Sequence, residues 1–316
     1  MLIKRKHVTN KIVVNKGIRY KMRARAFYVI MLPYFIMMVC VKGFPFAWGL
    51  YISFTNFTGF NIDKLKMVGI NNFARVLTDN EAISSIGRTF GISLIVVPLT
   101  ICICLLLSLL LNSKIKAIGA FRTIYYLPSI IPSIAVVTMW RGMFAKEGGL
   151  LNMVSILFGG KSINWLGYDF ARKSLIIMLL WSSGSGILTN LAAMKAVPND
   201  LYEAAEIEGA GYFTKLFKIT LPLISNMIYM NLVTGIIGML QLFGQPVLLT
   251  STAGAGLTAL PIRPIYTYLV HVYQQIFVNL RFGYGLAMVW VIFTIIMLLT
   301  MIMDKTSKYW VNNEMN

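Results

Sequence analysis

Six apolar stretches, each long enough to cross a lipid bilayer, dominate the sequence. They lie at about 26–50, 89–111, 123–144, 174–195, 222–243 and 283–303. A helix rises 1.5 Å per residue, so about 20 apolar residues cross the hydrocarbon core of a membrane. Because lipid offers no hydrogen-bond partner to the backbone, isolated stretches of this kind cross it as helices. We therefore predict an all-α, polytopic membrane protein with six transmembrane helices.

The composition supports this fold class. Hydrophobic residues make up 57% of the 316 residues and charged residues only 13%. An ordinary soluble domain carries about 25% charged residues, roughly twice that share. A soluble enzyme, a disordered chain and a small disulfide-stapled domain are therefore excluded.

The basic residues are distributed unevenly along the chain. The formal net charge is +18, and nine of the 29 Lys and Arg residues crowd positions 1–25, with no acidic residue among them. A basic chain can bind nucleic acid, but a basic block directly before a first span marks a cytoplasmic end. We expect residues 1–25 to be a basic cytoplasmic tail, residues 26–310 the membrane domain and residues 311–316 a second cytoplasmic tail. No nucleic-acid partner is expected, whereas contact of the first tail with the lipid surface stays open.

Motifs of catalysis and metal binding do not occur in the sequence. His7 and His271 are its two histidines, and no HExxH or CxxC pattern is present. The run Gly159-Gly160-Lys161-Ser162 resembles the end of a phosphate-binding loop, but Ser155 stands where that loop needs a glycine. We predict a protein that is not an enzyme and binds no metal or cofactor, so a partner subunit would bind ATP and magnesium for any ATP-driven work.

Charged residues are almost missing from the middles of the apolar stretches. Carriers coupled to protons or sodium usually keep an acidic residue within the membrane. Lys42 is the one exception here, and we expect it to reach toward the outer interface, with a place in the solute pathway as the alternative. An ion-coupled secondary transporter is therefore disfavoured.

One long polar interruption lies on the predicted cytoplasmic side, at about 198–221. Asp200 followed three residues later by Glu203 is typical of a capping box at a helix start. Gly209 suits the turn after a helix, where a residue with positive φ is needed. A second short helix is expected at about 211–218, with Pro222 early in the fifth span, where its missing N–H costs least. The pattern predicts two short helices joined at a glycine.

This interruption resembles the EAA loop of permease subunits in bacterial ABC importers, in the form found in the maltose and glycerol-phosphate permease group. The residues of the motif are Glu203, Ala204, Ala205, Glu208, Gly209, Leu221 and Pro222. The family usually has Asp where Glu208 stands. Further similarity covers roughly residues 26–310, including 68–73 and 282–287.

The resemblance implies the type I importer fold and several partners. The EAA loop would dock to a cytoplasmic ATPase, of which such importers hold two copies. A second homologous permease would complete the pore in the bacterial cytoplasmic membrane, and an extracytoplasmic solute-binding protein would deliver a carbohydrate. Both termini of this chain would then face the cytoplasm.

The same resemblance points to the solute pathway, because the middle of this fifth span lines the solute cavity in maltose-type permeases. The candidates are Gly235, Gly238, Met239, Gln241, Leu242 and Gln245, with Trp181 and Asn190 from the fourth span. Gln241 and Gln245 are expected one turn apart on one helix face, where they would bind sugar hydroxyl groups. Small residues on such a stripe also serve helix packing, and that alternative stays open.

The sequence therefore predicts a permease subunit of an ATP-driven importer for sugars or oligosaccharides. It would form half of the translocation pathway and couple to the ATPase through the EAA loop. An ABC permease for a non-sugar solute and an ion-coupled secondary transporter are the alternatives.

Overall fold

The computed structural model describes residues 25–60, 63, 65–113, 118–250 and 260–312. This part of the chain is predominantly helical and contains no β-strand. Its helices are η1 (Met38–Gly43), α2 (Phe44–Ser53), α3 (Asn71–Thr78), α4 (Asn80–Asn112), α5 (Ile118–Ile130), α6 (Ser133–Met143), α7 (Leu150–Leu157), α8 (Ala171–Trp181), α9 (Gly184–Ala196), α10 (Asn199–Ile207), α11 (Tyr212–Lys215), η2 (Leu216–Thr220), α12 (Leu221–Leu223), α13 (Ser225–Leu240), α14 (Gly244–Thr250), η4 (Arg263–Ile265), α15 (Tyr268–Tyr273), η5 (Gln274–Val278) and α16 (Phe282–Ser307).

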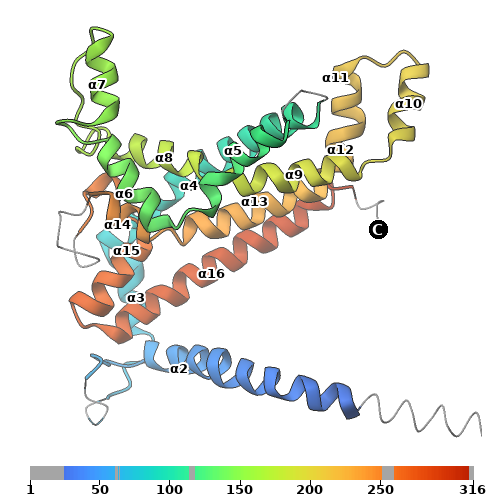
Figure 1. Ribbon diagram of the computed structural model, residues 1–316. Coiled ribbons are helices and arrows are strands. Elements are labelled where there is room, and N and C mark those ends of the chain that lie inside the picture. The colour runs from blue at the N-terminus through green and yellow to red at the C-terminus, as the bar shows by residue number, and fades with distance from the viewer. Residues whose placement is uncertain (1–24, 61–62, 64, 114–117, 251–259, 313–316) are drawn as a thin grey trace, which may run out of the picture.

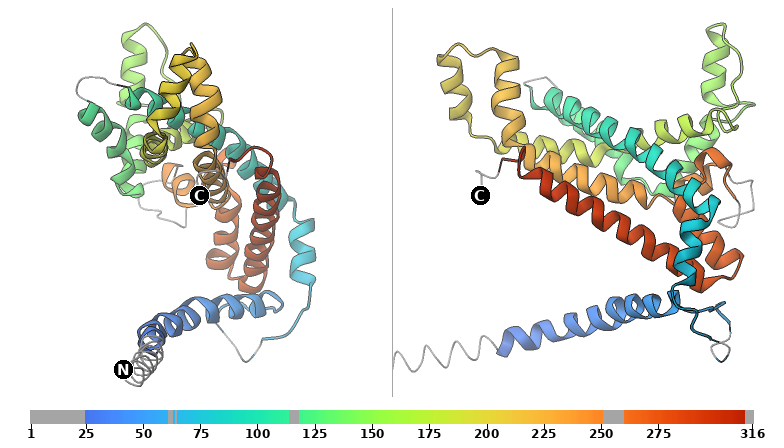
Figure 2. Two further views of the ribbon diagram at one scale, coloured as in Figure 1. Left: turned by 90° about the vertical axis from the view of Figure 1, so that its right-hand side faces the viewer. Right: turned by 180° about the vertical axis from the view of Figure 1, so that it is seen from behind.

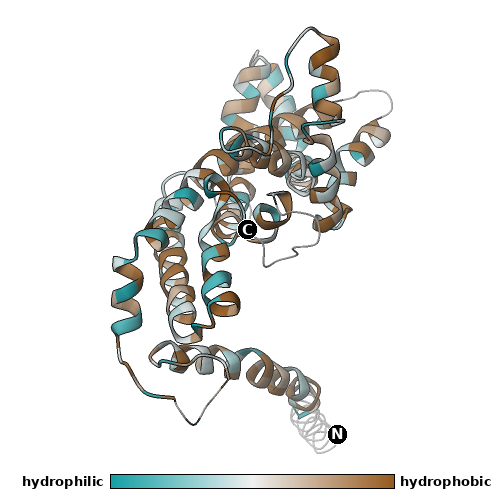
Figure 3. Cartoon of the chain, turned by 90° about the vertical axis from the view of Figure 1, so that its left-hand side faces the viewer, coloured by the Kyte–Doolittle hydropathy of each residue, from teal (hydrophilic) through white to brown (hydrophobic). Residues whose placement is uncertain are grey.

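Three continuous helices are long and apolar enough to cross a membrane. They are Arg25–Ser53, which includes η1 and α2, and the helices α4 and α16. Figure 1 shows Arg25–Ser53 and α16 as long continuous helices, and apolar residues predominate along them (Figure 3). The three helices coincide with the first, second and sixth apolar stretches, so the sequence prediction is confirmed for these spans.

The other three stretches are broken helices. The pairs α5–α6, α8–α9 and α11–α12 with α13 each pass the same test of length and composition only when the two parts are taken together. Their bends are 99°, 41° and 62°. If each bent pair is one span, the described residues hold six spans, as the sequence predicts.

The sharpest of these bends corrects the expectation of one helix over 123–144. Helix α5 ends at Ile130 and α6 begins at Ser133, with Pro132 as its N-cap residue. Proline fixes its own φ and disfavours the helical conformation in the residue before it, here Ile131. The chain therefore turns by 99° between the two helices.

Helix α4 is the central element of the bundle, and it packs against α8, α9, α13 and α15. One apolar core lies between α4, α6 and α8 around Val137, Leu175 and Met178. A second lies between α3, α15 and α16 around Tyr268 and Met288. These two cores hold the helices together at the end of the bundle that lies opposite α10 and α11 (Figure 2).

Helix Arg25–Ser53 stands apart from these cores. None of the residues in its most apolar window is buried within the chain. It packs mainly against α16, where the rings of Phe46 and Trp290 lie 4.6 Å apart, and its last residue, Ser53, accepts a hydrogen bond of 2.9 Å from Asn72 of α3. Most other large apolar side chains of this helix are therefore exposed to the surroundings of the chain.

A polar network closes the end of the bundle formed by α3, α15 and the start of α4. The Asp79 carboxylate caps α4 by accepting the N–H groups of Glu81 and Ala82, and it accepts the hydroxyl of Tyr284 at 2.7 Å. The Tyr266 hydroxyl lies 2.8 Å from Nδ1 of His271, whose Nε2 is 3.9 Å from Asp79. Burial lowers the pKa of His271 below its ordinary 6.5, despite the nearby carboxylate.

Candidate functional site

The segment from Asn199 to Leu223, which we call the knob, projects from one end of the bundle. Figure 1 shows α10 and the continuous helix formed by α11, η2 and α12 side by side, joined by a tight turn. The last residues of α16 lie at the same end (Figure 2). The prediction of two short helices joined at a glycine is confirmed.

The turn of the knob is built around Gly209, which has a φ of +80°. The N–H of Gly209 donates to the carbonyl of Glu206 at 3.0 Å, and the N–H of Ala210 donates to the carbonyl of Ala205 at 2.8 Å. These two bonds form a Schellman motif, which closes a helix on a residue in the left-handed conformation. The expected positive φ at Gly209 is confirmed.

The start of α10 differs from the expectation. The N-cap residue is Pro198, which makes no side-chain cap, and the helix begins at Asn199. The capping box predicted from Asp200 and Glu203 is therefore wrong. Asp200 still lies in the first turn, where a negative charge interacts favourably with the helix dipole.

Two side-chain contacts brace the helices of the knob. Lys215 Nζ lies 2.6 Å from Glu206 Oε1, and the hydroxyl groups of Tyr202 and Thr220 are 2.9 Å apart. The hydrogen bond and positive charge of Lys215 lower the pKa of Glu206. Glu206 therefore stabilises the knob by pairing with Lys215. The sequence pattern did not reveal this pair because the two residues are nine positions apart.

The free surface of the knob is both acidic and apolar. Glu203, Ala204, Glu208 and Gly209 are exposed on α10 and its turn, with Ala205 half-buried. Large apolar side chains are exposed beside them, and these are Leu201, Ile207, Tyr212, Phe213 and Phe217. An apolar surface of this kind with a carboxylate rim is suited to docking against another protein.

Leu221 and Pro222 lie at the base of the knob, away from its tip. The second helix continues through them to Leu223 and bends by 62° before α13 begins at Ser225. Pro222 therefore lies in the first turn of α12, in the part of the bent fifth span that precedes the bend, and not in α13. Leu221 packs on a small core that includes Met194 and Ile224, so it anchors the knob to the bundle.

Two cavities lie beside the broken spans. The first, of about 220 Å³, lies between α4, α9 and α13. Its lining residues are Val96, Val97, Thr100, Ile101, Cys104, Ser183, Ser185, Gly186, Asn231, Thr234, Gly235 and Met239. The second, of about 180 Å³, lies at the α5–α6 corner and is lined by Pro128, Ser129, Ile131, Ser133, Val136, Val137, Met178, Leu179, Ser182 and Gln245.

The structure separates the solute-pathway candidates of the sequence. Gly235 and Met239 line the first cavity, whereas Gln245 lines the second. Gln241 is the exposed C-cap residue of α13 and Gln245 belongs to α14, so the two do not share one helix face. That prediction is wrong because the helix ends at Leu240.

Three of the remaining candidates make contacts within the chain, and the fourth, Gly238, does not. Leu242 is buried in the core formed with α6 and α8. Trp181 ends α8, and its ring lies 5.9 Å from that of Trp140. Asn190 is fully buried and accepts a hydrogen bond of 2.9 Å from Asn231. No heavy atom lies within 4 Å of the Cβ position of Gly238, so its helix face is open.

The polar part of the first cavity was not predicted from the sequence. Asn231 and Thr234 lie on α13 about two turns and one and a half turns before Met239, and Ser183 and Thr100 line the same cavity from neighbouring segments. The spacing of Asn231, Thr234 and Gly235 places them on one helix face, a signal that the sequence does contain. The pairing with α4 and α9 becomes visible only in the folded chain.

Known proteins resemble this chain in sequence and in fold. A family model described as "Binding-protein-dependent transport system inner membrane component" matches residues 104–308. The probable ABC transporter permease protein YesP of Bacillus subtilis is 33% identical over 91% of this chain and 92% of its own length. The trehalose/maltose transport system permease protein MalF of Thermococcus litoralis is 31% identical over 74% of this chain and 80% of its own. A chain of a bacterial ABC transporter involved in the import of the acidic polysaccharide alginate has the same fold, with a TM-score of 0.76, 19% identity, and 92% and 97% coverage of the two chains.

Proposed function

The chain belongs to the family of binding-protein-dependent transport system inner membrane components, and we propose that it is the permease subunit of an ATP-driven importer for sugars or oligosaccharides. The observation that carries this proposal is the knob, which combines the family motif with the geometry of a docking element. Its acidic and apolar surface is exposed and not packed within the chain. The carbohydrate relatives support the class of solute.

The knob would couple this subunit to ATP hydrolysis. In our proposal it sits on a cytoplasmic ATPase, with Glu203, Ala204, Ala205, Glu208 and Gly209 at the contact. Leu221 and Pro222 at the base would transmit the movement of the knob to α13. ATP and magnesium would bind to the ATPase alone, and this chain would perform no chemistry.

The complete importer would contain further subunits. A second homologous permease would form the other half of the pathway, two ATPases would bind from the cytoplasm, and an extracytoplasmic protein would deliver the solute. The bacterial cytoplasmic membrane would surround the permeases. The start of helix Arg25–Ser53, the end of α16 and the knob lie at one end of the molecule in Figure 2, which supports cytoplasmic positions for both termini.

The solute would move along α13 as the complex alternates between outward-facing and inward-facing states. The first cavity, with Gly235 and Met239 beside the polar groups of Asn231 and Thr234, supports this route. Its mixture of hydroxyl, amide and apolar groups matches what a neutral sugar needs from a wall. Gly238, Gln241 and Gln245 would join the pathway on the side facing the second permease, with Leu242, Trp181 and Asn190 supporting it.

Reconstitution from purified subunits tests the proposal. The chain alone should bind no ATP and take up no sugar into liposomes. Uptake should appear when the second permease, the ATPases and the solute-binding protein are present with ATP, and it should stop when an inactive ATPase is used. Sugar uptake by the chain alone under an ion gradient would refute the proposal in favour of a secondary transporter. ATP-driven uptake of a non-sugar solute alone would refute the carbohydrate part.

A further inference from the structure

The segment between α6 and α8 forms an arm that projects sideways from the bundle. Figures 1 and 2 show α7 at the end opposite the knob, running across the direction of the long helices and away from them. Helix α7 comprises Leu150–Leu157. The position of the arm raises the question of what surrounds it in the assembled protein.

The polar side of α7 faces its own loop. Asn152 is only 2% exposed, and its amide nitrogen donates to the carbonyls of Ala145 at 3.2 Å, Lys146 at 3.1 Å and Ile163 at 2.9 Å. Its amide oxygen accepts the N–H of Ile163 at 3.0 Å and the indole N–H of Trp165 at 3.1 Å. This network fixes the rotation of the helix about its axis.

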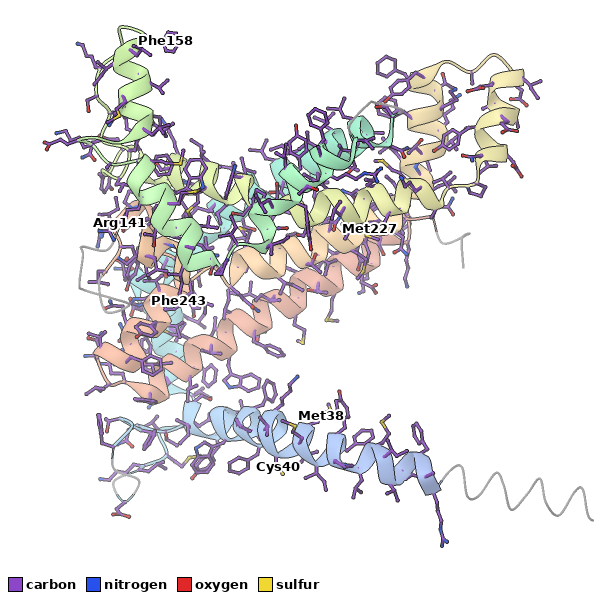
Figure 4. The ribbon with its side chains drawn as sticks, viewed as in Figure 1. Met38, Cys40, Arg141, Phe158, Met227 and Phe243 are labelled. Carbon is purple, nitrogen blue, oxygen red and sulfur yellow. The ribbon has the colours of Figure 1, made fainter. Side chains whose placement is uncertain are left out.

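The outward side of α7 is apolar. Leu150, Met153, Val154, Leu157 and Phe158 follow the spacing i, i+3, i+4, i+7 and i+8, which places them on one helix face. Their exposed fractions run from 45% at Val154 to 84% at Phe158. Figure 4 shows Phe158 at the free end of α7, remote from the bundle. A helix that buries its amide and exposes its apolar stripe has the reverse of the pattern found in water.

Basic and aromatic residues border this stripe. Lys146 and Lys161 are exposed on the loops at the two ends of α7. The exposed Tyr168 lies on the return segment, whereas Trp165 is half-buried and packs inward against the ring of Phe144. Tryptophan and tyrosine concentrate at the level of lipid headgroups, and lysine is complementary to lipid phosphates. Glu147 and Asp169 are also exposed on the arm, so it carries no excess of positive charge, and what favours a membrane surface is the exposed apolar stripe with a tyrosine and two lysines beside it.

We propose that α7 is an interfacial anchor, which lies in the boundary between headgroups and acyl chains of the leaflet opposite the knob. The stripe from Leu150 to Phe158 enters the acyl chains, while Lys146 and Lys161 remain with the phosphate groups. The anchor holds the corner formed by α6 and α8 at a fixed depth as the bundle changes shape. The proposal requires only that the spans cross a membrane and does not depend on the solute.

Spin-label accessibility tests the anchor in the complete importer. Cys40, Cys102 and Cys104 are first replaced by alanine, and a nitroxide is then attached to Leu157→Cys or Phe158→Cys. Glu147→Cys, on an exposed polar position of the same arm, is the matched control. The labelled complexes are placed in vesicles of phosphatidylcholine and phosphatidylglycerol. Collisions with oxygen, which concentrates in lipid, are compared with collisions with a water-soluble nickel chelate.

The labels at 157 and 158 should show a ratio of oxygen to nickel accessibility several-fold higher than the label at 147. Equal nickel accessibility at all three positions would place the stripe in water and overturn the proposal. Exclusion of both reagents from 157 and 158 would show that a protein covers the stripe, and would also overturn it. ATP-driven uptake in the same vesicles verifies that the complexes are intact, so the anchor can fail while the proposed function stands.

Discussion

At the scale of single residues, Gly209 determines the shape of the knob through its backbone. Its φ of +80° lies in the left-handed region, and no heavy atom lies within 4 Å of the position that a Cβ would occupy. Space is therefore available for a larger side chain, and only the backbone conformation opposes one. Gly211 provides the matched case, because it too has open space but a φ of −73°.

We expect Gly209→Val to reduce transport severely and Gly211→Val to leave it close to normal. A side chain in the left-handed conformation costs about 1–2 kcal/mol, and a β-branched residue is among the least tolerant. The strained turn would move Glu203 and Glu208 out of register with the ATPase. Sugar uptake and co-purification of the ATPase with each variant provide the measurement. Similar losses in both variants, or in neither, would show that the conformation of Gly209 is not what couples the subunits.

His271 makes the opposite end of the bundle sensitive to acid. Its imidazole is 4% exposed and lies between the Tyr266 hydroxyl and the Asp79 carboxylate. Because burial lowers the pKa of His271, the folded chain holds the imidazole neutral where the unfolded chain already binds a proton. By linkage, stability is then present above the ordinary pKa of 6.5 and is lost as pH falls below it.

The thermal unfolding midpoint of the wild-type chain in nanodiscs should therefore decrease as the pH is lowered from 7.5 to 5.5. The variant His271→Gln should show a smaller fall over this range, since its amide cannot be protonated. Differential scanning fluorimetry at several pH values, with the same nanodisc lipid throughout, measures both slopes. An identical pH dependence in the two proteins would assign the acid sensitivity to other groups.

At the scale of elements, contacts between its two helices hold the knob together, and the segment after α16 lies against its base. The ion pair between Glu206 and Lys215 joins its two helices. At its base, the backbone N–H of Asn312 donates to Ser225 Oγ at 2.8 Å, directly after the bend that leads into α13. The segment after α16 therefore contacts the bend through which the knob would act on the span.

A charge exchange separates bracing from docking in the knob. Glu206→Lys alone should weaken transport because it places two positive charges together, and adding Lys215→Glu should restore transport by remaking the pair in reverse. Glu203→Lys should lose ATPase binding, and Lys215→Glu should not rescue it, because in our proposal the exposed Glu203 contacts the ATPase and not Lys215. ATPase retention and uptake of the three variants and the double variants measure this. Failure of the exchange to rescue Glu206→Lys would show that Glu206 contacts the ATPase directly.

At the scale of the whole molecule, the helices place two groups of elements at opposite ends of the bundle. The knob and the last turn of α16 lie at one end, while α3, α7 and α15 lie at the other (Figure 1). Tyr309 is 92% exposed near the first end and Ile70 is 72% exposed near the second. If the spans cross the membrane as proposed, these two residues face opposite aqueous compartments.

A membrane-impermeant maleimide should label Tyr309→Cys and Gly211→Cys only in inside-out vesicles. It should label Ile70→Cys only in right-side-out vesicles. The three native cysteines are replaced by alanine in each variant, and labelling after detergent treatment gives the total reactive amount. Labelling of Tyr309→Cys and Ile70→Cys from the same side would contradict the proposed topology.

The sequence by itself determined the class of fold, the position of the spans and the turn of the knob. Each of these depends on a local property: apolar length for the spans, and the tolerance of positive φ for Gly209. The tertiary structure decided what depends on contacts between distant residues. The break at Ile224, the pairing of Asn190 with Asn231 and the separation of Gln241 from Gln245 belong to this group, whereas the break at Ile131 follows locally from Pro132. Apolar residues have the same hydropathy whether a helix continues or bends, so hydropathy alone cannot place a break. The outward stripe of α7 was likewise hidden, because only the hydrogen bonds of Asn152 fix which side of that helix faces away from the protein.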